Sequence, residues 1–251
     1  MARALSKMGY CSRSQAAELI QLGRVALNGR TLRDPERPVS VERDRISVDN
    51  RPIREREKVY LMMNKPRGIV TTASDEKGRD TVYKLLNQTR QSSETLVAKS
   101  LQWIAPVGRL DKASEGLLLL TNDSEWGGRV TAPNTHLEKM YHVQIARIAD
   151  QTLIESLTRG VKAEDGEILR AKRLHALRAG QKNCWLEIIL DEGKNRHIRR
   201  MLDALDVEVL RLVRVAIGPL LLGNLAKGAF RPLTTGEKQM LDHAMAGAAR
   251  E

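Results

Sequence analysis

The sequence predicts an α+β protein in which a small α/β domain precedes a large mixed, mainly antiparallel sheet flanked by helices. Predicted strands outnumber predicted helices, and the two do not alternate strictly along the chain. A polar charge run, REREK at residues 54–58, separates a short basic segment from the rest of the chain. We therefore expect a domain at residues 1–53, a linker at 54–58, a larger domain at 59–235 and a C-terminal helix or tail at 236–251.

The first 53 residues contain the signals of a helix followed by a hairpin. Between residues 12 and 23, apolar side chains recur at helical spacing after a serine and before a glycine. Asn28 and Gly29 then lie between apolar residues, which is typical of a tight turn between antiparallel strands. Residues 45–53 alternate as a further short strand, and the whole segment is rich in arginine.

The larger domain begins with a buried strand at residues 59–64 and contains the four-leucine run LLLLTN at 117–122, which reads as a fully buried strand. The other strands are expected at residues 69–72, 140–148, 167–177, 184–190 and 207–218. The helices are expected at residues 78–88, 124–130, 151–160, 195–205 and 234–249. Residues 89–100 are polar, so we expect a surface loop there.

Charge is the most informative bulk property. The chain has 42 Lys and Arg against 31 Asp and Glu, a net charge of +11, which favours a polyanionic partner such as nucleic acid over an incidentally basic surface. Aromatic residues make up only 3%, so a platform for stacking bases is not expected. No run of 18 apolar residues and no secretory pattern occurs, and Cys11 and Cys184 fit no metal or redox motif. We expect a cytoplasmic protein that does not bind membranes.

Several catalytic motifs are absent. The sequence has no phosphate-binding GxxxxGK[ST] loop, no GxGxxG after a strand, no HExxH, no EF-hand loop and no GxSxG elbow. The five histidines do not pair with Cys or carboxylates at metal-ligand spacing. Nucleotide hydrolysis and zinc chemistry are therefore not indicated, and we expect no metal at the functional site.

One stretch combines charge and burial in an unusual way. In GRLDKASEGLLLL, Asp111 lies between Arg109 and Lys112 directly before the leucine run. A charge beside a buried strand must be paired or solvated, and the simple alternative is a turn that only closes a loop. Tyr141 enters a later strand, and four Lys or Arg lie within KNRHIRR at 194–200. Read alone, these are a half-buried aromatic residue and a solvated helix face.

Taken together, these stretches resemble a known family. GRLDKASEGLLLLTND, preceded by NKPRG and followed by KMYHVQI, EGKNRHIRRML and LVRVAIGPL, is similar in order and content to the RsuA-like pseudouridine synthases. SRSQAAELIQLGRVALNG resembles an S4 domain, a small RNA-binding module that usually precedes that catalytic domain. Trp126, Gly127 and Gly128 depart from the family's usual helix-forming residues, which leaves the regularity of that helix open.

The resemblance implies an enzyme that isomerises a uridine in ribosomal RNA, with 23S favoured over 16S, and that needs no cofactor. It assigns the nucleophile to Asp111, stacking on the uracil to Tyr141, and pairing with Asp111 to Arg199. Arg109 corresponds to the arginine that takes the place of the extruded base, and Ile198 to an apolar residue of the uracil pocket. The basic residues expected to contact RNA are Arg13, Arg24, Arg30, Lys65, Lys194, Arg196 and Arg200.

Two other functions compete with this one. The first is a non-catalytic S4-containing RNA-binding or ribosome-assembly protein, against which the intact set of Asp111, Tyr141 and Arg199 argues. The second is a metal-dependent nuclease, which would need clustered carboxylates that the sequence does not show. We expect the partner to be ribosomal RNA or a pre-ribosomal particle, the protein to be a monomer, and Asp111 and Arg199 to form an ion pair within about 4 Å.

Overall fold

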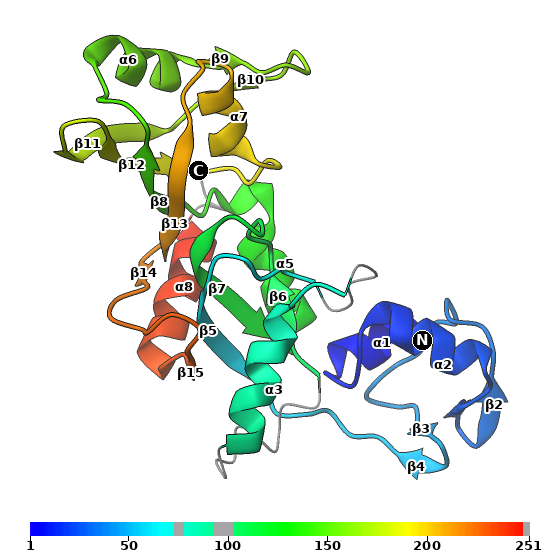
Figure 1. Cartoon of the computed structure of the whole chain (residues 1–251). Helices are drawn as coiled ribbons and strands as arrows, with labels where there is room; N and C mark the ends of the chain where they lie inside the picture. The colour runs from blue at the N-terminus through cyan, green and yellow to red at the C-terminus, as the bar shows by residue number, and fades with distance from the viewer. Residues whose placement is uncertain (73–77, 93–102, 248–251) are drawn as a thin grey trace.

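The computed structural model describes residues 1–72, 78–92 and 103–247 (Figure 1). The N-terminal domain contains α1 (Ala2–Lys7), α2 (Arg13–Gln21), β1 (Val25–Leu27), β2 (Arg30–Leu32), β3 (Ile46–Val48) and β4 (Arg51–Pro52). The rest of the chain contains β5 (Tyr60–Lys65), α3 (Val82–Ser92), β6 (Ala105–Val107), β7 (Glu115–Thr121), α5 (Ser124–Thr131), the 3-10 turn η1 (Pro133–Thr135), β8 (Lys139–Ile145), α6 (Gln151–Arg159), β9 (Val161–Lys162), β10 (Ile168–Leu169), β11 (Arg173–Ala179), β12 (Cys184–Leu190), α7 (His197–Asp203), β13 (Val209–Ile217), β14 (Leu220–Leu221), β15 (Phe230–Pro232) and α8 (Thr235–Gly247). Within these described ranges, no helix has the length and apolar character needed to cross a membrane.

The N-terminal domain packs α1 and α2 on an antiparallel sheet in the order β2-β1-β3-β4. Ser12 begins α2 with a reciprocal cap: its hydroxyl accepts from the Gln15 amide, and the Gln15 side chain accepts from the Ser12 amide, both at 3.1 Å. Asn28 and Gly29 have φ values of 50° and 81°, the left-handed conformation that a two-residue hairpin turn requires. The predicted helix and hairpin are therefore confirmed.

The linker is bonded to both parts of the chain. The Arg56 amide donates to the Met8 carbonyl at 3.1 Å, and the Asn122 side chain makes two hydrogen bonds of 2.8 Å to the backbone around the linker's end. The N-terminal domain also contacts α5 directly, because the Lys7 ammonium forms an ion pair with Glu125. The two domains are thus held together by more than their covalent connection.

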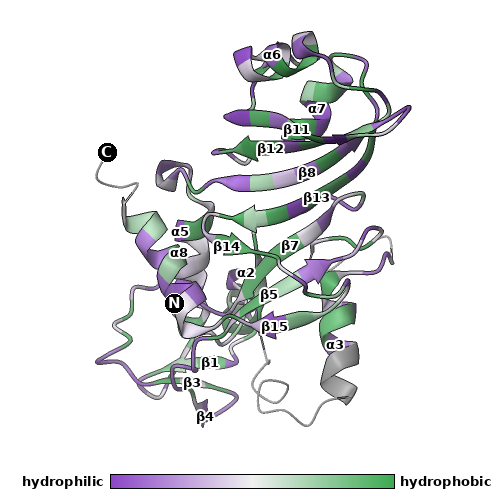
Figure 2. Cartoon of the chain, turned by 90° about the vertical axis from the view of Figure 1, so that its left-hand side faces the viewer, coloured by the Kyte–Doolittle hydropathy of each residue, from purple (hydrophilic) through white to green (hydrophobic). Residues whose placement is uncertain are grey.

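The large sheet has nine strands, with the order β11-β12-β8-β13-β7-β5-β15 and with β14 and β6 added to β13 and β7 (Figure 2). Of its strand pairs only β13 and β7 are parallel, and the others are antiparallel. This is the mixed, mainly antiparallel sheet that the sequence predicts. The single parallel pair joins the two halves of the sheet, and the chain between β7 and β13 builds the half that ends at β11.

The four-leucine run is buried because helices cover both faces of β7. Leu117 and Leu119 pack in a cluster with Trp126 and with α8, whereas Leu118 and Leu120 pack in a cluster with α3. Figure 2 shows α5 and α8 on one side of β7 and α3 on the other. All seven residues of the strand are buried, as expected for a strand covered on both faces.

The other half of the sheet packs against α6 and α7. Val143 of β8, Leu186 of β12 and Leu212 of β13 form one buried cluster with Leu157 of α6 and Ile198 of α7. The two-stranded β9–β10 hairpin follows α6 in the chain and contacts α7. This packing brings α7 beside the loop that leads into β7, which decides the geometry of the site.

The unusual residues after the leucine run do not interrupt α5. Asp123 caps the helix by accepting from the Trp126 amide at 3.1 Å, and α5 is continuous over its length. Trp126 is 1% exposed, and its indole donates to Asp242 of α8 at 2.9 Å. Gly127 lies against Val107 of the neighbouring strand β6. The departure from the family pattern therefore serves packing.

Three other expectations are corrected by the structure. The helix expected at 78–88 continues to Ser92, so the start of the expected 89–100 loop is helical, and residues 93–100 lie outside the described residues. The single strand expected at 167–177 is divided into β10 and β11. The strand expected at 69–72 is only an isolated bridge between Val70 and Thr81, whereas the expected C-terminal helix forms as α8 and packs through Leu241 and Met245 into the same buried cluster as Trp126.

Candidate active site

A cavity of about 380 Å³ opens where the loop before β7 meets α7 and the strands β8, β12 and β13. This volume is within the range of small-molecule sites in proteins. Asp111, Tyr141, Ile198, Arg199 and Arg109 all line it, although they come from distant parts of the sequence. The structure thus brings together the five residues that the resemblance assigns to catalysis and substrate binding.

Backbone hydrogen bonds fix the loop that carries Asp111. The Thr71 hydroxyl donates to the Leu110 carbonyl at 2.8 Å and accepts from the Leu110 amide at 3.3 Å. The Gly68 amide donates to the Lys112 carbonyl at 2.7 Å, and the Ser114 amide donates to the carbonyl of Asp111 at 3.0 Å. The residues on both sides of Asp111 are therefore anchored, and its side chain remains at the cavity.

Lys65 supports the same loop from inside the protein. Its side chain is fully buried, and its ammonium donates to the carbonyls of Ser114 at 2.8 Å and Pro66 at 3.0 Å. Burial lowers the pKa of Lys65 to about 8, although the carboxylates of Asp111 and Glu115 act in the opposite direction. The expectation that Lys65 contacts RNA is therefore wrong, because a buried ammonium bonded to the backbone cannot reach a phosphate.

Tyr141 and Ile198 supply the apolar part of the cavity. Tyr141 is half-buried on β8 and packs against the buried clusters of both halves of the sheet. Ile198, in the first turn of α7, is 3% exposed. A flat aromatic face beside a branched aliphatic side chain suits a planar heterocycle such as a nucleobase.

Arg199 contacts the loop of Asp111 but not its carboxylate. In the described part of the chain, the expected ion pair within about 4 Å is not formed. The Arg199 Nη2 instead donates to the carbonyl of Ala113 at 3.1 Å. Burial lowers the pKa of Arg199 with help from Arg196, while the negative charge of Asp111 raises it, so the two groups interact at longer range. Among the described residues, the Asp111 carboxylate therefore has no direct ion pair with Arg199.

Polar atoms without partners concentrate at this cavity. Five buried side-chain atoms lack a hydrogen-bond partner in the described ranges. Two of them, Arg199 Nε and Arg214 Nη2, belong to arginines that line the cavity, and two more belong to the His197 ring, which interacts with the backbone of Arg170. Buried polar groups are nearly always satisfied, so such a concentration indicates a place prepared for a polar ligand. Burial lowers the pKa of His197, which favours its neutral form.

Sequence reasoning missed His197 and Arg214 as site residues. For Arg214 a signal exists, because it lies in phase with Leu212 and Ala216, on the buried side of an alternating strand. An arginine in that phase needs a partner or a ligand. For His197 the sequence offers less, since its neighbours in KNRHIRR are charged and suggest an exposed turn.

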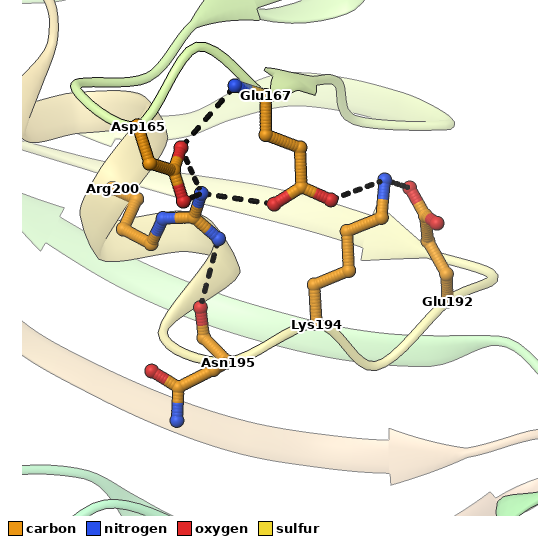
Figure 3. Close-up of polar contacts among 6 residues, drawn as sticks. All are labelled: Asp165, Glu167, Glu192, Lys194, Asn195 and Arg200. Atoms are coloured by element: carbon orange, nitrogen blue, oxygen red, sulfur yellow. Dashed lines mark hydrogen bonds and ion pairs between the residues drawn. The ribbon is translucent and has the colours of Figure 1, made fainter.

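Two further cations of this motif, Lys194 and Arg200, are paired with carboxylates (Figure 3). Arg200 bonds to Asp165 at 2.5 and 2.6 Å and to Glu167 at 2.9 Å, which ties α7 to the β9–β10 hairpin. Lys194 lies 3.3 Å from Glu167 and 3.0 Å from Glu192. Neighbouring carboxylates therefore balance much of the charge of Arg200 and Lys194, and their contact with RNA stays a prediction.

The remaining basic residues also divide into paired and unpaired ones. Arg24 forms a two-point contact with Asp49 at 2.8 and 2.6 Å and so stabilises the N-terminal domain. Four other arginines are exposed and form no ion pair among the residues that the structure describes: Arg13, Arg30, Arg109 and Arg196. These four are the cations of the expected set that stay available to a polyanion.

The fold and the cavity together define an enzyme with an RNA-binding module. A small domain with exposed arginines precedes a larger one, whose cavity combines a carboxylate, a tyrosine and unpartnered cationic donors. Within the described ranges, no group of three or more His, Cys, Asp or Glu is placed to hold a metal ion. The chain belongs to the RNA pseudouridylate synthase family, whose model matches residues 59–204, and an S4 domain matches residues 2–46.

The sequence similarity to known proteins extends over almost the whole chain. It is 36% identical to an uncharacterised RNA pseudouridine synthase of Aquifex aeolicus, covering 96% of this chain and 92% of the relative. It is 33% identical to ribosomal large subunit pseudouridine synthase B of Bacillus subtilis, covering 95% and 93%. A crystal structure of a pseudouridylate synthase superposes with a TM-score of 0.64 at 28% identity, covering 96% and 98%. The protein is therefore an RNA pseudouridine synthase, an isomerase, and not only an RNA-binding protein.

Proposed function

We propose that this enzyme isomerises one uridine of ribosomal RNA, in the large-subunit RNA rather than the small, and that Asp111 is its nucleophile. The choice of RNA is supported by the Bacillus subtilis relative, which is named for the large ribosomal subunit. The nucleophile is supported by one observation: a loop anchored through its backbone presents Asp111 at the cavity, with no direct ion pair to any residue that the structure describes.

The proposed isomerisation needs a nucleophile, a group that removes a proton and a pocket for the base. The bond between N1 of uracil and C1′ of ribose breaks and a bond between C5 and C1′ forms, while C5 loses its proton to the solvent and N1 takes one up. No electrons are exchanged overall, so the reaction needs no redox cofactor. The Asp111 carboxylate forms a transient covalent bond to the substrate during the rearrangement, and this bond breaks again before the product leaves. Tyr141 stacks on the base and takes part in the removal of the C5 proton, while Ile198 excludes water.

Binding requires that the target base leaves its stack and enters the cavity. In this proposal, Arg109 fills the place of the extruded base, and Arg196 holds phosphates at the mouth of the cavity. Arg13 and Arg30 of the S4 domain bind the flanking RNA, largely through its phosphates. We expect a monomer that acts in the cytoplasm, where ribosomal RNA is made into particles.

The test is to map pseudouridines in total ribosomal RNA by carbodiimide labelling, in cells with the gene and in cells without it. We expect one site in the large-subunit RNA to lose its label without the gene. The purified enzyme should restore that site on RNA from the deleted strain. A site that disappears only from small-subunit RNA or from transfer RNA would overturn the assignment of the substrate.

A further inference from the structure

Arg214 lies on β13, and its side chain contributes to the lining of the cavity. It is 6% exposed and lines the same space as Asp111, Tyr141 and Ile198. Strand pairing sets its position, because it lies opposite Tyr141 of β8 on one side and opposite Gly116 of β7 on the other. Partners in neighbouring strands face the same side of a sheet, so the guanidinium and the tyrosine ring face the same ligand space.

The backbone at Arg214 has little freedom. A Cβ atom at position 116 would lie 2.2 Å from the Arg214 carbonyl oxygen, so only glycine permits this approach of β7 to β13. Gly116 has a φ of 104°, which also favours glycine. The close approach fixes the start of the Arg214 side chain relative to the loop of Asp111.

The Arg214 guanidinium has a hydrogen-bond acceptor for Nε but none for Nη2 among the described residues. Its Nε donates to the Leu117 carbonyl at 2.7 Å, whereas Nη2 is buried and has no hydrogen-bond partner in the described part of the chain. The nearby carboxylate of Glu115 is already engaged by Arg211 and Lys227. An arginine is always charged and can only donate, so the free Nη2 requires an acceptor that the protein itself does not supply.

The position of this donor limits what the acceptor can be. When a nucleotide is extruded into a cavity, the base reaches farthest from the backbone and the phosphates stay at the mouth. Arg109 and Arg196 line the cavity and are exposed, so they can bind phosphates there. Arg214 is a buried residue of the cavity lining, and a base that enters the cavity brings the carbonyl oxygens of uracil as acceptors.

We propose that Arg214 Nη2 donates a hydrogen bond to a carbonyl oxygen of the target uracil and so orients the base in the cavity. This inference rests on the proposed function of the cavity. Uracil carries O2 and O4, whereas cytosine replaces O4 by an amino group that cannot accept. A fixed donor at O4 therefore rejects cytosine, while a donor at O2 orients either pyrimidine for attack by Asp111.

The experiment replaces one acceptor at a time. The probe is the ribosomal RNA fragment identified by the mapping above, synthesised with uridine, 2-thiouridine or 4-thiouridine at the target position. Sulfur is a weak acceptor, so one of the two thio substitutions should lower kcat/KM of the wild type about tenfold or more. Arg214→Gln should lower kcat/KM on the uridine RNA by about tenfold to a hundredfold. The same thio substitution should then cause no further loss in Arg214→Gln.

The missing second loss is the decisive readout, because a merely structural role of Arg214 would leave both losses independent. Arg159→Gln is the matched control: this arginine lies on α6, is 79% exposed at its side chain and pairs with Glu155. The control should keep the wild-type rate and the wild-type sensitivity to sulfur. Thermal unfolding monitors the fold, and Arg214→Met, which keeps the buried length without donors, replaces Arg214→Gln if the latter does not fold.

Two results would overturn the inference alone: a wild type that neither thio substitution slows, or a thio effect of equal size in the wild type and the Arg214 variants. In both cases conversion of the uridine RNA by the wild type would still support the proposed function. A wild type that converts no ribosomal RNA fragment would instead remove the proposed function, and this inference with it.

Discussion

At the scale of single residues, Asp111 owes its position to its neighbours. Thr71 holds Leu110, and Arg199 holds Ala113, so the loop is fixed by contacts that do not involve the Asp111 carboxylate. Changing this carboxylate should therefore leave the loop, the fold and the basic surface in place. This separation makes Asp111 a suitable position for testing chemistry without disturbing structure.

Asp111→Asn keeps the shape of the side chain but removes its charge, and Asp111→Ala removes its polar atoms. Since a nucleophile is lost in each, we expect both to form no detectable pseudouridine and to bind the substrate RNA as the wild type does. Release of tritium from C5-labelled uridine measures the reaction, because rejoining at C5 expels that hydrogen. Glu164→Gln, which removes an exposed carboxylate from the β9–β10 turn, is the charge control. Tritium release near the wild-type rate by Asp111→Ala would refute the role of the nucleophile.

Local patterns predicted the presence of the site residues better than their contacts. Asp111, Tyr141 and Ile198 gather at one cavity, as the motifs indicate. Lys65 was misassigned because a lysine in an NKPRG turn suggests solvent, and its burial depends on the distant Ser114. Arg214 was missed because its partners are set by pairing with strands far away in the sequence.

At the scale of elements, α8 is attached to the sheet by a polar contact as well as by its apolar face. Arg231 of β15 makes two hydrogen bonds to Glu237 of α8, at 2.7 and 2.6 Å. The Glu237 carboxylate also accepts from the Thr234 amide at 2.8 Å, and the Thr234 hydroxyl accepts from the Glu237 amide at 3.2 Å. One carboxylate thus caps the helix and joins it to the last strand.

This contact should give the stability of the protein a measurable pH dependence. The hydrogen bond to Arg231 lowers the pKa of Glu237 from 4.5 to about 2. Because the folded-state pKa is below the ordinary value, the contribution is fully present above about pH 4.5 and is lost as the pH falls towards 2. The pair is partly exposed, so we expect Glu237→Gln to cost about 1 kcal/mol or less near neutral pH.

Thermal unfolding of the wild type and Glu237→Gln between pH 3 and 7 checks this sign. The difference in Tm, about 2–4 °C or less near neutral pH, should shrink steadily below about pH 4.5. Glu155→Gln, which removes a carboxylate from an exposed pair on α6, should show a smaller difference. A Tm difference that stays constant or grows on acidification would contradict the assigned pKa.

The elements themselves follow from the sequence where the pattern is local. The leucine run and the hairpin at Asn28 and Gly29 both form as predicted. The end of α3 and the division between β10 and β11 were not foreseen, because each depends on which neighbours cover the segment. The continuity of α5 through Gly127 and Gly128 has the same origin, since α5 is packed on both β6 and α8.

At the scale of the whole molecule, only some of the basic residues behind the net charge of +11 are available to RNA. Arg24, Lys194 and Arg200 are balanced by neighbouring carboxylates, whereas Arg13 and Arg30 of the S4 domain are exposed and unpaired among the described residues. The charge that an RNA can use is therefore smaller than the composition suggests, and part of it lies outside the catalytic domain.

Removing residues 1–53 should weaken binding to the substrate RNA and flatten its dependence on salt, because phosphate contacts are lost together with the released counterions. The double variant Arg13→Gln, Arg30→Gln tests the same idea in the full chain and should reduce the slope of log K against log salt by roughly one per lost contact. Arg24→Gln is the matched control, with a smaller effect expected because this side chain already pairs with Asp49. Unchanged affinity and slope in the truncated protein would exclude the S4 domain from binding.

The single parallel contact between β7 and β13 also determines when this protein can finish folding. The strand β7 is made early, but its neighbour β13 and the helix that covers Leu117 and Leu119 come from the far end of the chain. Such long-range contacts slow folding, and open strand edges invite aggregation. A nascent chain on the ribosome therefore carries a leucine strand whose face at Leu117 and Leu119 is only partly covered until α8 has been synthesised, which makes that interval the period in which a chaperone has most to protect.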